Sequence, residues 1–172
     1  MRTMFSILLF FFLAVSCDKN QGNSTQISGH VVGNPPCKNA LKSENLPPTV
    51  SDTLSCIEYS YNADRETLTL THINASFNCC PDSLLCSVEL LGNTIVVDEF
   101  NKTASCRCNC LYDLTIDIVG VRANSYKLKI VEPYIEDQEE LVFNIDIAKE
   151  PAGSFCVERN YYPWAESGKT IE

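Results

Sequence analysis

Hydrophobic and polar residues alternate with a period of two over much of residues 56–147. The pattern is clearest in residues 66–72, where Leu68, Leu70 and His72 form one row and threonines form the other. Because successive side chains of a strand point to opposite faces, this alternation predicts half-buried β-strands. We therefore expect His72 on the same face as the two leucines, as a packed and hydrogen-bonded histidine.

Turn residues interrupt the alternation about every ten positions, which predicts seven or eight short strands. Residues 62–65 and Gly92-Asn93 are the expected turns of two antiparallel hairpins. No segment has the 3.6-residue period of a helix. Strands are predicted at residues 30–32, 56–61, 66–72, 87–91, 94–99, 112–119, 126–130 and 142–147.

This series of strands favours an all-β fold, an antiparallel β-sandwich of immunoglobulin-like size, with a closed barrel as the rival architecture. Residues 151–172 are predicted to be irregular, with Tyr161, Tyr162 and Trp164 packing back on the sandwich near Cys156. A chain of 172 residues is long enough for one domain with a sizeable core.

The formal net charge of −9 argues against binding to nucleic acid and against electrostatic binding to anionic lipid. An acidic surface of this kind mainly favours solubility. The sequence therefore predicts no nucleic-acid partner.

The N-terminal segment has the pattern of an export signal. Arg2 precedes an apolar run over residues 4–15, which is too short to span a bilayer but fits the hydrophobic region of a signal peptide. The segment ends in Ala14-Val15-Ser16-Cys17, which resembles the lipobox of bacterial lipoproteins, although Ala14 stands where leucine is usual. The resemblance implies cleavage before Cys17 and a diacylglyceryl anchor on this cysteine. The competing interpretation is plain secretion, with Cys17 as another disulfide partner.

On the lipoprotein interpretation the chain has three parts. Residues 1–16 are the signal peptide, residues 17–36 are the lipidated Cys17 and a flexible polar tether, and residues 37–172 are a single β-sandwich domain. We expect a bacterial cell-envelope protein, held to a membrane by its lipid and facing the periplasm or the cell surface.

Ten cysteines in 172 residues exceed what reduced cytosolic packing uses. They indicate either an oxidising compartment with disulfides or metal binding. If Cys17 carries lipid, an odd number remains and at least one thiol is free. The disulfide candidates are Cys37, Cys56, Cys79, Cys80, Cys86, Cys106, Cys108, Cys110 and Cys156.

Two sets of pairings are predicted. Cys37 and Cys156 flank the strands, so a bond between them would tie the two ends of the domain together. The segment 106–110 is expected to be extended, with its three sulfurs about 7 Å apart on one face. The second set would cross neighbouring strands, from Cys79, Cys80 and Cys86 to Cys106, Cys108 and Cys110.

The alternative to a disulfide framework is a metal site, because thiolates and imidazoles bind zinc or copper(I). Against it, the spacing lacks the paired C-x-x-C pattern of a zinc ribbon, and an exported chain meets an oxidising environment. The candidate ligands are Cys79, Cys80, Cys106, Cys108, Cys110 and His72.

Catalytic motifs are missing from the sequence. There is no G-x-S-x-G, no H-E-x-x-H and no phosphate-binding glycine loop, and the chain has two histidines. We therefore predict a non-enzymatic binding or structural module, without a cofactor, that takes a protein or glycan ligand. The alternative is an envelope lipoprotein that binds zinc or copper.

Two motifs flank the central hairpin: H-x-N-x-x-F-N-C-C-P over residues 72–81 and C-x-C-x-C-x-Y-D-L over residues 106–114. Together they resemble a group of exported lipoproteins of Bacteroidota. The resemblance covers about 40 residues and implies no known activity, so no site residue follows from it.

Overall fold

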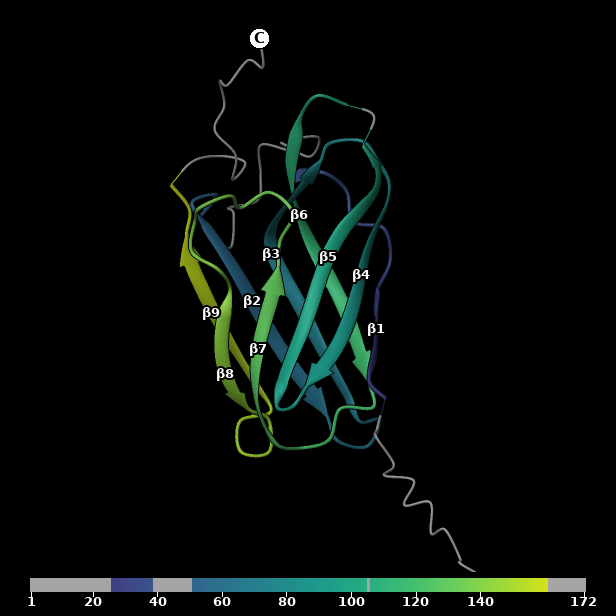
Figure 1. Ribbon diagram of the computed structural model, residues 1–172, viewed down its shortest axis with the longest axis vertical. Coiled ribbons are helices and arrows are strands. Elements are labelled where there is room, and N and C mark those ends of the chain that lie inside the picture. The colour runs from purple at the N-terminus through teal and green to yellow at the C-terminus, as the bar shows by residue number, and fades with distance from the viewer. Residues whose placement is uncertain (1–25, 39–50, 105, 161–172) are drawn as a thin grey trace, which may run out of the picture.

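Two β-sheets packed face to face form the structure (Figure 1). The computed structural model describes residues 26–38, 51–104 and 106–160. The strands are β1 (Ser28–Val31), β2 (Leu54–Asn62), β3 (Thr67–Asn78), β4 (Pro81–Leu91), β5 (Thr94–Ala104), β6 (Asn109–Val119), β7 (Ser125–Val131), β8 (Val142–Asp146) and β9 (Ala152–Glu158).

The first sheet has the order β1-β6-β3-β2-β9 and the second the order β4-β5-β7-β8. Neighbouring strands are antiparallel except β5 and β7, which run parallel. The predicted all-β sandwich is confirmed, with one parallel pair added. Over the described ranges, no helix reaches the length and apolarity that crossing a membrane requires.

Both predicted hairpins are present. In the first, Asn62 pairs with Thr67 across the turn between β2 and β3. In the second, Leu91 pairs with Thr94, and Gly92 has a φ of 65°. Glycine adopts this left-handed conformation without a steric penalty, which explains its place in a two-residue turn.

The core lies between the sheets and is built from the inward rows of the alternating strands. Its side chains are mostly branched aliphatic residues, which pack well on a pleated surface. The largest fully buried side chains are Ile57, Leu68, Leu70, Phe77, Ile95, Leu114, Ile116, Ile118, Leu128, Ile130 and Leu141.

Two predictions about the ends of the domain need correction. The range 17–36, predicted as a tether, contains β1, which pairs with β6, so the sheet begins before residue 37. Residues 152–158, predicted to be irregular, form β9 and pair with β2. The predicted aromatic cluster of Tyr161, Tyr162 and Trp164 lies outside the described residues.

A bulge in β3 helps to hold in place the end of the sandwich that carries the cysteines. The register between β3 and β6 shifts at Asn74, which has a φ of 64°. Asparagine tolerates this conformation, and its Nδ2 donates hydrogen bonds to the carbonyl oxygens of Ser51 and Leu54 at 3.0 and 2.7 Å. The bulge therefore connects β3 to the segment that leads into β2.

Candidate functional site

Four inward rows of apolar side chains end in charged or titratable residues at the same depth of the sandwich. Each row follows the period of two, so its last member points into the core like the apolar residues before it. The rows are Leu68-Leu70-His72 on β3, Ile95-Val97-Glu99 on β5, Leu128-Ile130-Glu132 on and after β7, and Phe155-Val157-Arg159 on and after β9.

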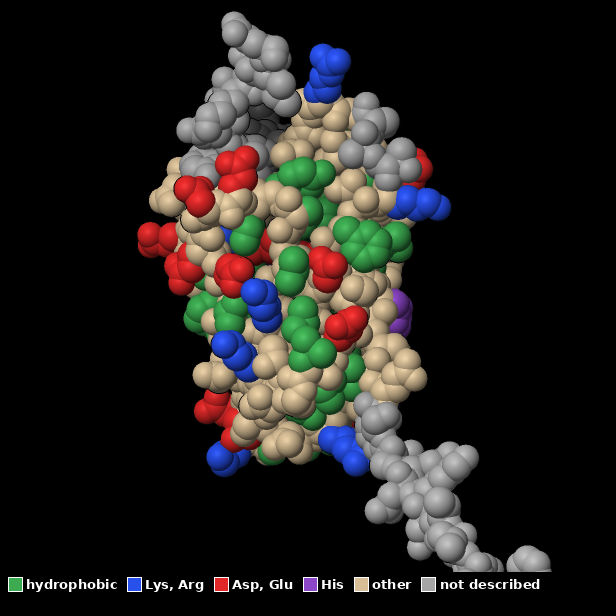
Figure 2. Space-filling model, in the orientation of Figure 1, with side chains coloured by type: hydrophobic (Ala, Val, Ile, Leu, Met, Phe, Trp, Pro, Cys, Tyr) green, Lys and Arg blue, Asp and Glu red, His purple; other side chains and the backbone are tan. Residues whose placement is uncertain are grey.

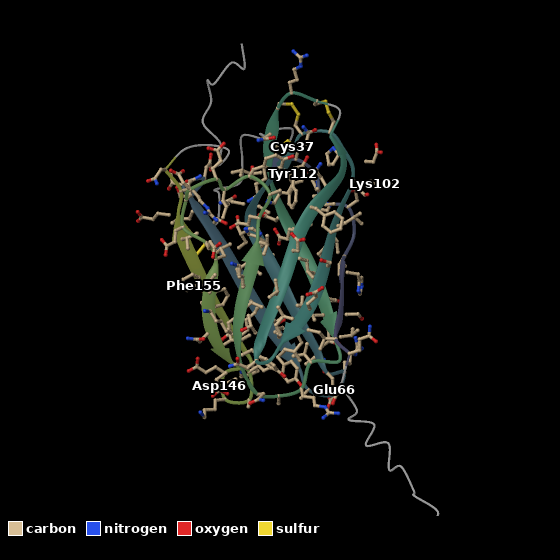
Figure 3. All side chains as sticks on the ribbon, in the orientation of Figure 1. Cys37, Glu66, Lys102, Tyr112, Asp146 and Phe155 are labelled. Atoms are coloured by element: carbon tan, nitrogen blue, oxygen red, sulfur yellow. A yellow bond between two sulfur atoms is a disulfide. The ribbon has the colours of Figure 1, made fainter. Side chains whose placement is uncertain are left out.

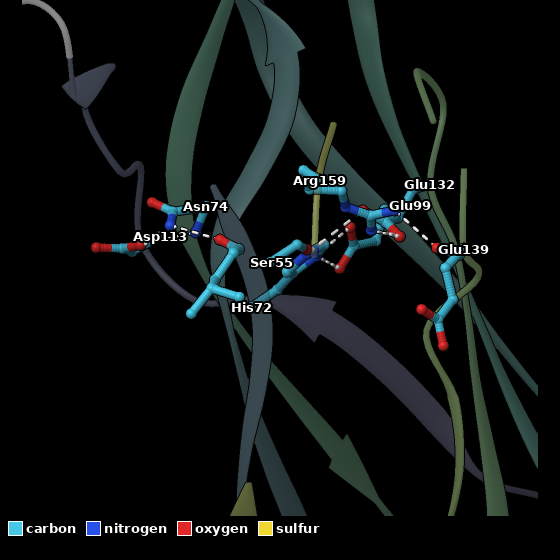
Figure 4. A network of polar contacts seen from close by, with 9 residues as sticks. Ser55, His72, Asn74, Glu99, Asp113, Glu132, Glu139 and Arg159 are labelled. Carbon is cyan, nitrogen blue, oxygen red and sulfur yellow. Dashed lines mark hydrogen bonds and ion pairs between the residues drawn. The ribbon is translucent and has the colours of Figure 1, made fainter. Parts of the chain in front are cut away.

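With Ser55 of β2, these four residues form the buried charge network drawn in Figure 4. The first sheet provides Ser55 on β2, His72 on β3, and Arg159 directly after β9. The second sheet provides Glu99 on β5 and Glu132 directly after β7. The network therefore connects the two sheets through their interior. Exposed fractions are 0% for Ser55 and His72, 1% for Glu99, 8% for Glu132 and 4% for Arg159.

His72 lies at the centre of the buried charge network. Its Nδ1 is 2.9 Å from Oε2 of Glu99, and its Nε2 is 2.8 Å from Oγ of Ser55. The Nε2 atom is also 3.5 Å from Oε1 of Glu132. A protonated imidazole donates from both nitrogens, so this arrangement fits the charged form of the ring.

Arg159 provides the second positive group. Its Nη2 donates to Oε2 of Glu132 at 2.6 Å, and its Nη1 donates to the carbonyl oxygen of Glu139 at 2.7 Å. With His72 protonated, two positive groups face two carboxylates and the network is electrically neutral. Buried charges require such pairing, because each ion loses its hydration on folding.

The surroundings shift the pKa values of two members of the network. Burial alone would lower the pKa of His72, but Glu99 and Glu132 outweigh burial and raise it above its usual value. Burial raises the pKa of Glu132, with a contribution from Glu99, against the opposing effects of His72 and Arg159. Both groups therefore hold protons more tightly in the folded chain than in the unfolded chain.

This linkage predicts a stability that falls as the pH rises. A group whose pKa is raised by folding stabilises the folded chain at pH values below the pKa that it has in the unfolded chain. This stabilisation is lost as the pH rises through the pKa that the group has in the folded chain. For His72 the loss begins near its unfolded pKa of about 6.5 and proceeds by about 1.4 kcal/mol per pH unit for one proton. We expect the midpoint of urea unfolding to fall between pH 6 and 9.

The matched pair for this experiment is His72→Gln and His30→Gln. Glutamine keeps a hydrogen-bonding side chain but does not titrate, and His30 is an exposed residue of β1. The His72→Gln protein should be less stable at pH 6 and should have a flatter pH dependence, whereas His30→Gln should behave like the unaltered chain. An unchanged slope in His72→Gln would show that His72 does not carry the effect.

The order Ser55–His72–Glu99 is that of a nucleophile, a base and an orienting carboxylate in hydrolases. The distances of 2.8 and 2.9 Å suit proton transfer along the three residues. However, Ser55 and His72 have no exposed surface, so no substrate can approach Oγ in this structure. The arrangement as it stands neutralises buried charge and holds the sheets together.

The cysteine-rich end of the sandwich contains two connections that cross from one sheet to the other. The chain leaves β3 of the first sheet for β4 of the second, and later leaves β5 of the second for β6 of the first. Disulfides Cys79–Cys108 and Cys80–Cys106 join these two connections. We call these four residues the cysteine tip; Figure 3 shows sulfur bonds at the end where Cys37 and Tyr112 are labelled.

Two further disulfides, Cys37–Cys110 and Cys56–Cys156, tie peripheral segments to the sheets. The predicted bond between Cys37 and Cys156 is therefore wrong: Cys37 follows β1 and reaches β6, whereas Cys156 pairs with Cys56 of β2. Four disulfides among the described cysteines indicate an oxidising, extracytoplasmic environment.

The second set of predicted disulfide pairings is partly correct. Cys79 and Cys80 do bond across to the second connection, but Cys110 turns into the core and Cys86 is free. The predicted extended row of three sulfurs is also wrong, because β6 begins at Asn109 and Cys106 and Cys108 precede it. The four cysteines of the tip lie in connections that cross between the sheets. The paths of these connections, and not the periodicity of a strand, therefore determine which cysteines are bonded.

Cys86 on β4 lies opposite Glu99 of β5. Burial and the Glu99 carboxylate raise the pKa of the Cys86 thiol to about 11. At neutral pH the thiol is therefore protonated, which makes it a poor nucleophile and a poor metal ligand.

The outer face of the β4-β5-β7-β8 sheet mixes apolar and charged side chains (Figure 2). Leu85 and Phe100 are directly opposite each other on β4 and β5, with exposed fractions of 37% and 39%. This pair provides a small apolar contact surface next to charged residues.

The six metal-ligand candidates do not lie together as predicted. His72 is inside the buried charge network and Cys110 is bonded to Cys37 in the core, whereas the other four form the cysteine tip. Sequence reasoning placed His72 correctly but missed Glu99, Glu132 and Arg159. The apolar rows of the predicted strands lead to Glu99 and Glu132 one period on, whereas Arg159 follows β9, a strand that the sequence did not predict.

Comparison with known proteins adds no family to these observations: no protein-family model, curated protein or solved structure matches the chain.

Proposed function

We propose that the chain is a lipid-anchored module of the bacterial cell envelope that binds or supports another component without catalysing a reaction. The observation that carries the proposal is a sandwich tied by four disulfides whose hydrolase-like residues are completely buried. Such a fold offers a stable surface, with Leu85 and Phe100 as its apolar contact, and keeps its polar chemistry inside.

The anchor part of the proposal depends on the sequence Ala14-Val15-Ser16-Cys17. A diacylglyceryl group supplies two acyl chains, and each buried methylene contributes about 0.8 kcal/mol to membrane binding. Two chains are what stable anchoring requires, whereas a single chain dissociates readily. The described part of the chain then lies outside the membrane, in agreement with its disulfides.

Cell fractionation of the full chain and of Cys17→Ala tests the anchor. We expect the unaltered chain in the detergent-extracted membrane fraction and Cys17→Ala in the soluble extracytoplasmic fraction. Cys86→Ala is the matched control, because it removes a thiol outside the four disulfides and should stay with the membrane. Membrane retention of Cys17→Ala would refute the anchor, and an unaltered chain that is itself soluble would favour plain secretion.

The second candidate function is binding of zinc or copper at the cysteine tip. It is favoured by one observation: the Sγ atoms of Cys79, Cys106 and Cys108 lie within 4.8 Å of one another. Four cysteine sulfurs gathered at one place are the ligand set that soft metals prefer. In this candidate the tip is the functional site and the sandwich is its support.

A further inference from the structure

We propose that the cysteine tip is a redox-gated metal site: its two disulfides can be reduced before the other two, and the four released thiolates then bind one Zn²⁺ ion. The proposal deepens the second candidate function and rests on it. It is independent of the lipid anchor. It also narrows the ligand set to Cys79, Cys80, Cys106 and Cys108.

The first argument is the difference in exposure among the disulfides. In each tip disulfide one partner is exposed and the other half-buried: Cys108 with Cys79, and Cys106 with Cys80. The other two disulfides each contain one buried partner, Cys110 with no exposed surface and Cys56 with 2%, although Cys156, which is bonded to Cys56, is exposed. Because an attacking thiolate must reach a sulfur, a disulfide in which neither partner is buried is open to attack at both sulfurs and exchanges faster.

The second argument is that the tip is held together by contacts that do not involve sulfur. The amide of Cys79 donates to the carbonyl oxygen of Cys108 at 2.9 Å, and Asn78 Nδ2 donates to the carbonyl oxygen of Cys106 at 2.5 Å. The hydroxyl of Tyr112 donates to the carbonyl oxygen of Asn78 at 2.9 Å. These hydrogen bonds keep both connections in place after reduction.

The third argument is the size of the sulfur cluster. In a tetrahedral site with Zn–S bonds of about 2.3 Å, neighbouring sulfurs are about 3.8 Å apart. Three tip sulfurs already lie within 4.8 Å of one another, and the fourth, of Cys80, is bonded to Cys106. Small side-chain movements therefore convert the reduced cluster into a four-sulfur site. The exposed Arg107 between two of the ligands adds a positive charge, which favours thiolates.

The chemistry balances with an external dithiol as the reductant. Each dithiol gives two electrons and two protons to one tip disulfide and becomes a disulfide itself, so two dithiols release four thiols. Binding of Zn²⁺ then replaces the four thiol protons, which leave to water. In the oxidised tip the sulfurs are bonded to each other and supply no thiolate, so oxidation closes the site.

The test compares the purified full chain before and after mild anaerobic treatment with dithiothreitol. Alkylation and peptide mass spectrometry identify which cysteines have been reduced. The part of the sample that is not alkylated is freed of dithiothreitol and used for two titrations. Zn²⁺ is added in competition with a chromogenic chelator, and Co²⁺ is added to detect the thiolate-to-metal absorption band. Cys86→Ala is the control that keeps all four tip ligands, and Cys79→Ala/Cys108→Ala removes two of them.

We expect alkylation at the four tip cysteines first, one Zn²⁺ per reduced chain, and no stoichiometric Zn²⁺ on the oxidised chain. Cys79→Ala/Cys108→Ala should weaken Zn²⁺ binding at least tenfold, and Cys86→Ala should leave it unchanged. Reduced tip thiols without stoichiometric Zn²⁺ would overturn the metal site. Equal binding by the oxidised chain, or earlier reduction of Cys37–Cys110 or Cys56–Cys156, would overturn the gate. The comparison of oxidised and reduced unaltered protein does not depend on any variant folding.

Discussion

Removal of the disulfide between Cys56 and Cys156 is expected to lower the free energy of unfolding by about 4–5 kcal/mol. The bond closes a loop with a sequence separation of 100, the longest among the described disulfides. In the chain-entropy model, the longer the closed loop, the more the crosslink restricts the unfolded chain. Because β9 is an edge strand that, among the described strands, pairs with β2 alone, the bond also holds this strand to its sheet.

The experiment is urea unfolding of Cys56→Ala/Cys156→Ala under non-reducing conditions. Alanine is preferred to serine because Cys56 is buried and a hydroxyl there would need a partner. Cys86→Ala removes a cysteine without removing a crosslink and is the control. The matched comparison is Cys80→Ala/Cys106→Ala, which opens a loop with a separation of only 26. A larger loss from the tip pair than from the Cys56–Cys156 pair would contradict the loop-length argument.

The strands could be predicted from the sequence because their burial follows a local rule. Alternation placed Leu68, Leu70 and His72 on one buried face, and the structure confirms it. β9 escaped prediction because most of its residues are exposed and its pattern has few apolar positions. Its conformation is set by pairing with β2, where a Cβ on Gly153 would lie 2.7 Å from the Tyr59 hydroxyl oxygen.

The cysteine pairings could not be predicted, because they depend on which connections change sheets. The two-residue turn at Gly92 keeps the chain in one sheet, and a local pattern identifies it. The crossovers at Cys79-Cys80 and before Asn109 have no comparable local sequence pattern, since β3 and β5 could each have been followed by a strand of the same sheet. Non-local contacts between the sheets determine where the chain crosses.

The sequence indicated only part of the buried charge network. His72 continues a row of leucines, and Glu99 and Glu132 continue rows of isoleucine, valine and leucine. A lone carboxylate at the end of such a row normally indicates that the strand has reached solvent, because burying one charge costs several kcal/mol. Only the meeting of four rows from two sheets makes the burial of all four groups acceptable.

Replacement of Arg159 by methionine is expected to lower the free energy of unfolding by about 3–5 kcal/mol near pH 8. Methionine has a similar length and is apolar, so it fills the space without the charge. The loss leaves Glu99 and Glu132 facing His72 alone, and the second oxygen of Glu132 is without a hydrogen bond within the described residues. Removing one member of a buried pair costs more than the pair contributes, because the remaining charge is unpaired.

The matched control is Lys149→Met. Lys149 forms an ion pair with Asp146 at 2.8 Å, but its side chain is 82% exposed, so the same chemical change should have little effect on stability. The double variant Arg159→Met/Glu132→Gln should recover part of the loss, since it removes both charges of the pair. The single variant Glu132→Gln completes the double-mutant cycle. Urea unfolding of the unaltered chain, the two single variants and the double variant then gives the coupling between Arg159 and Glu132.

The pH dependence separates loss of charge from loss of packing. Burial already raises the pKa of Glu132, and without Arg159 the carboxyl should take up a proton at still higher pH. The destabilisation by Arg159→Met should therefore be smaller at pH 5 than at pH 8, because a proton on Glu132 removes the unpaired charge. If the loss were equal at both pH values and no larger than that of Lys149→Met, Arg159 would not be neutralising a buried carboxylate. Arg159 would then add no measurable stability to the sandwich.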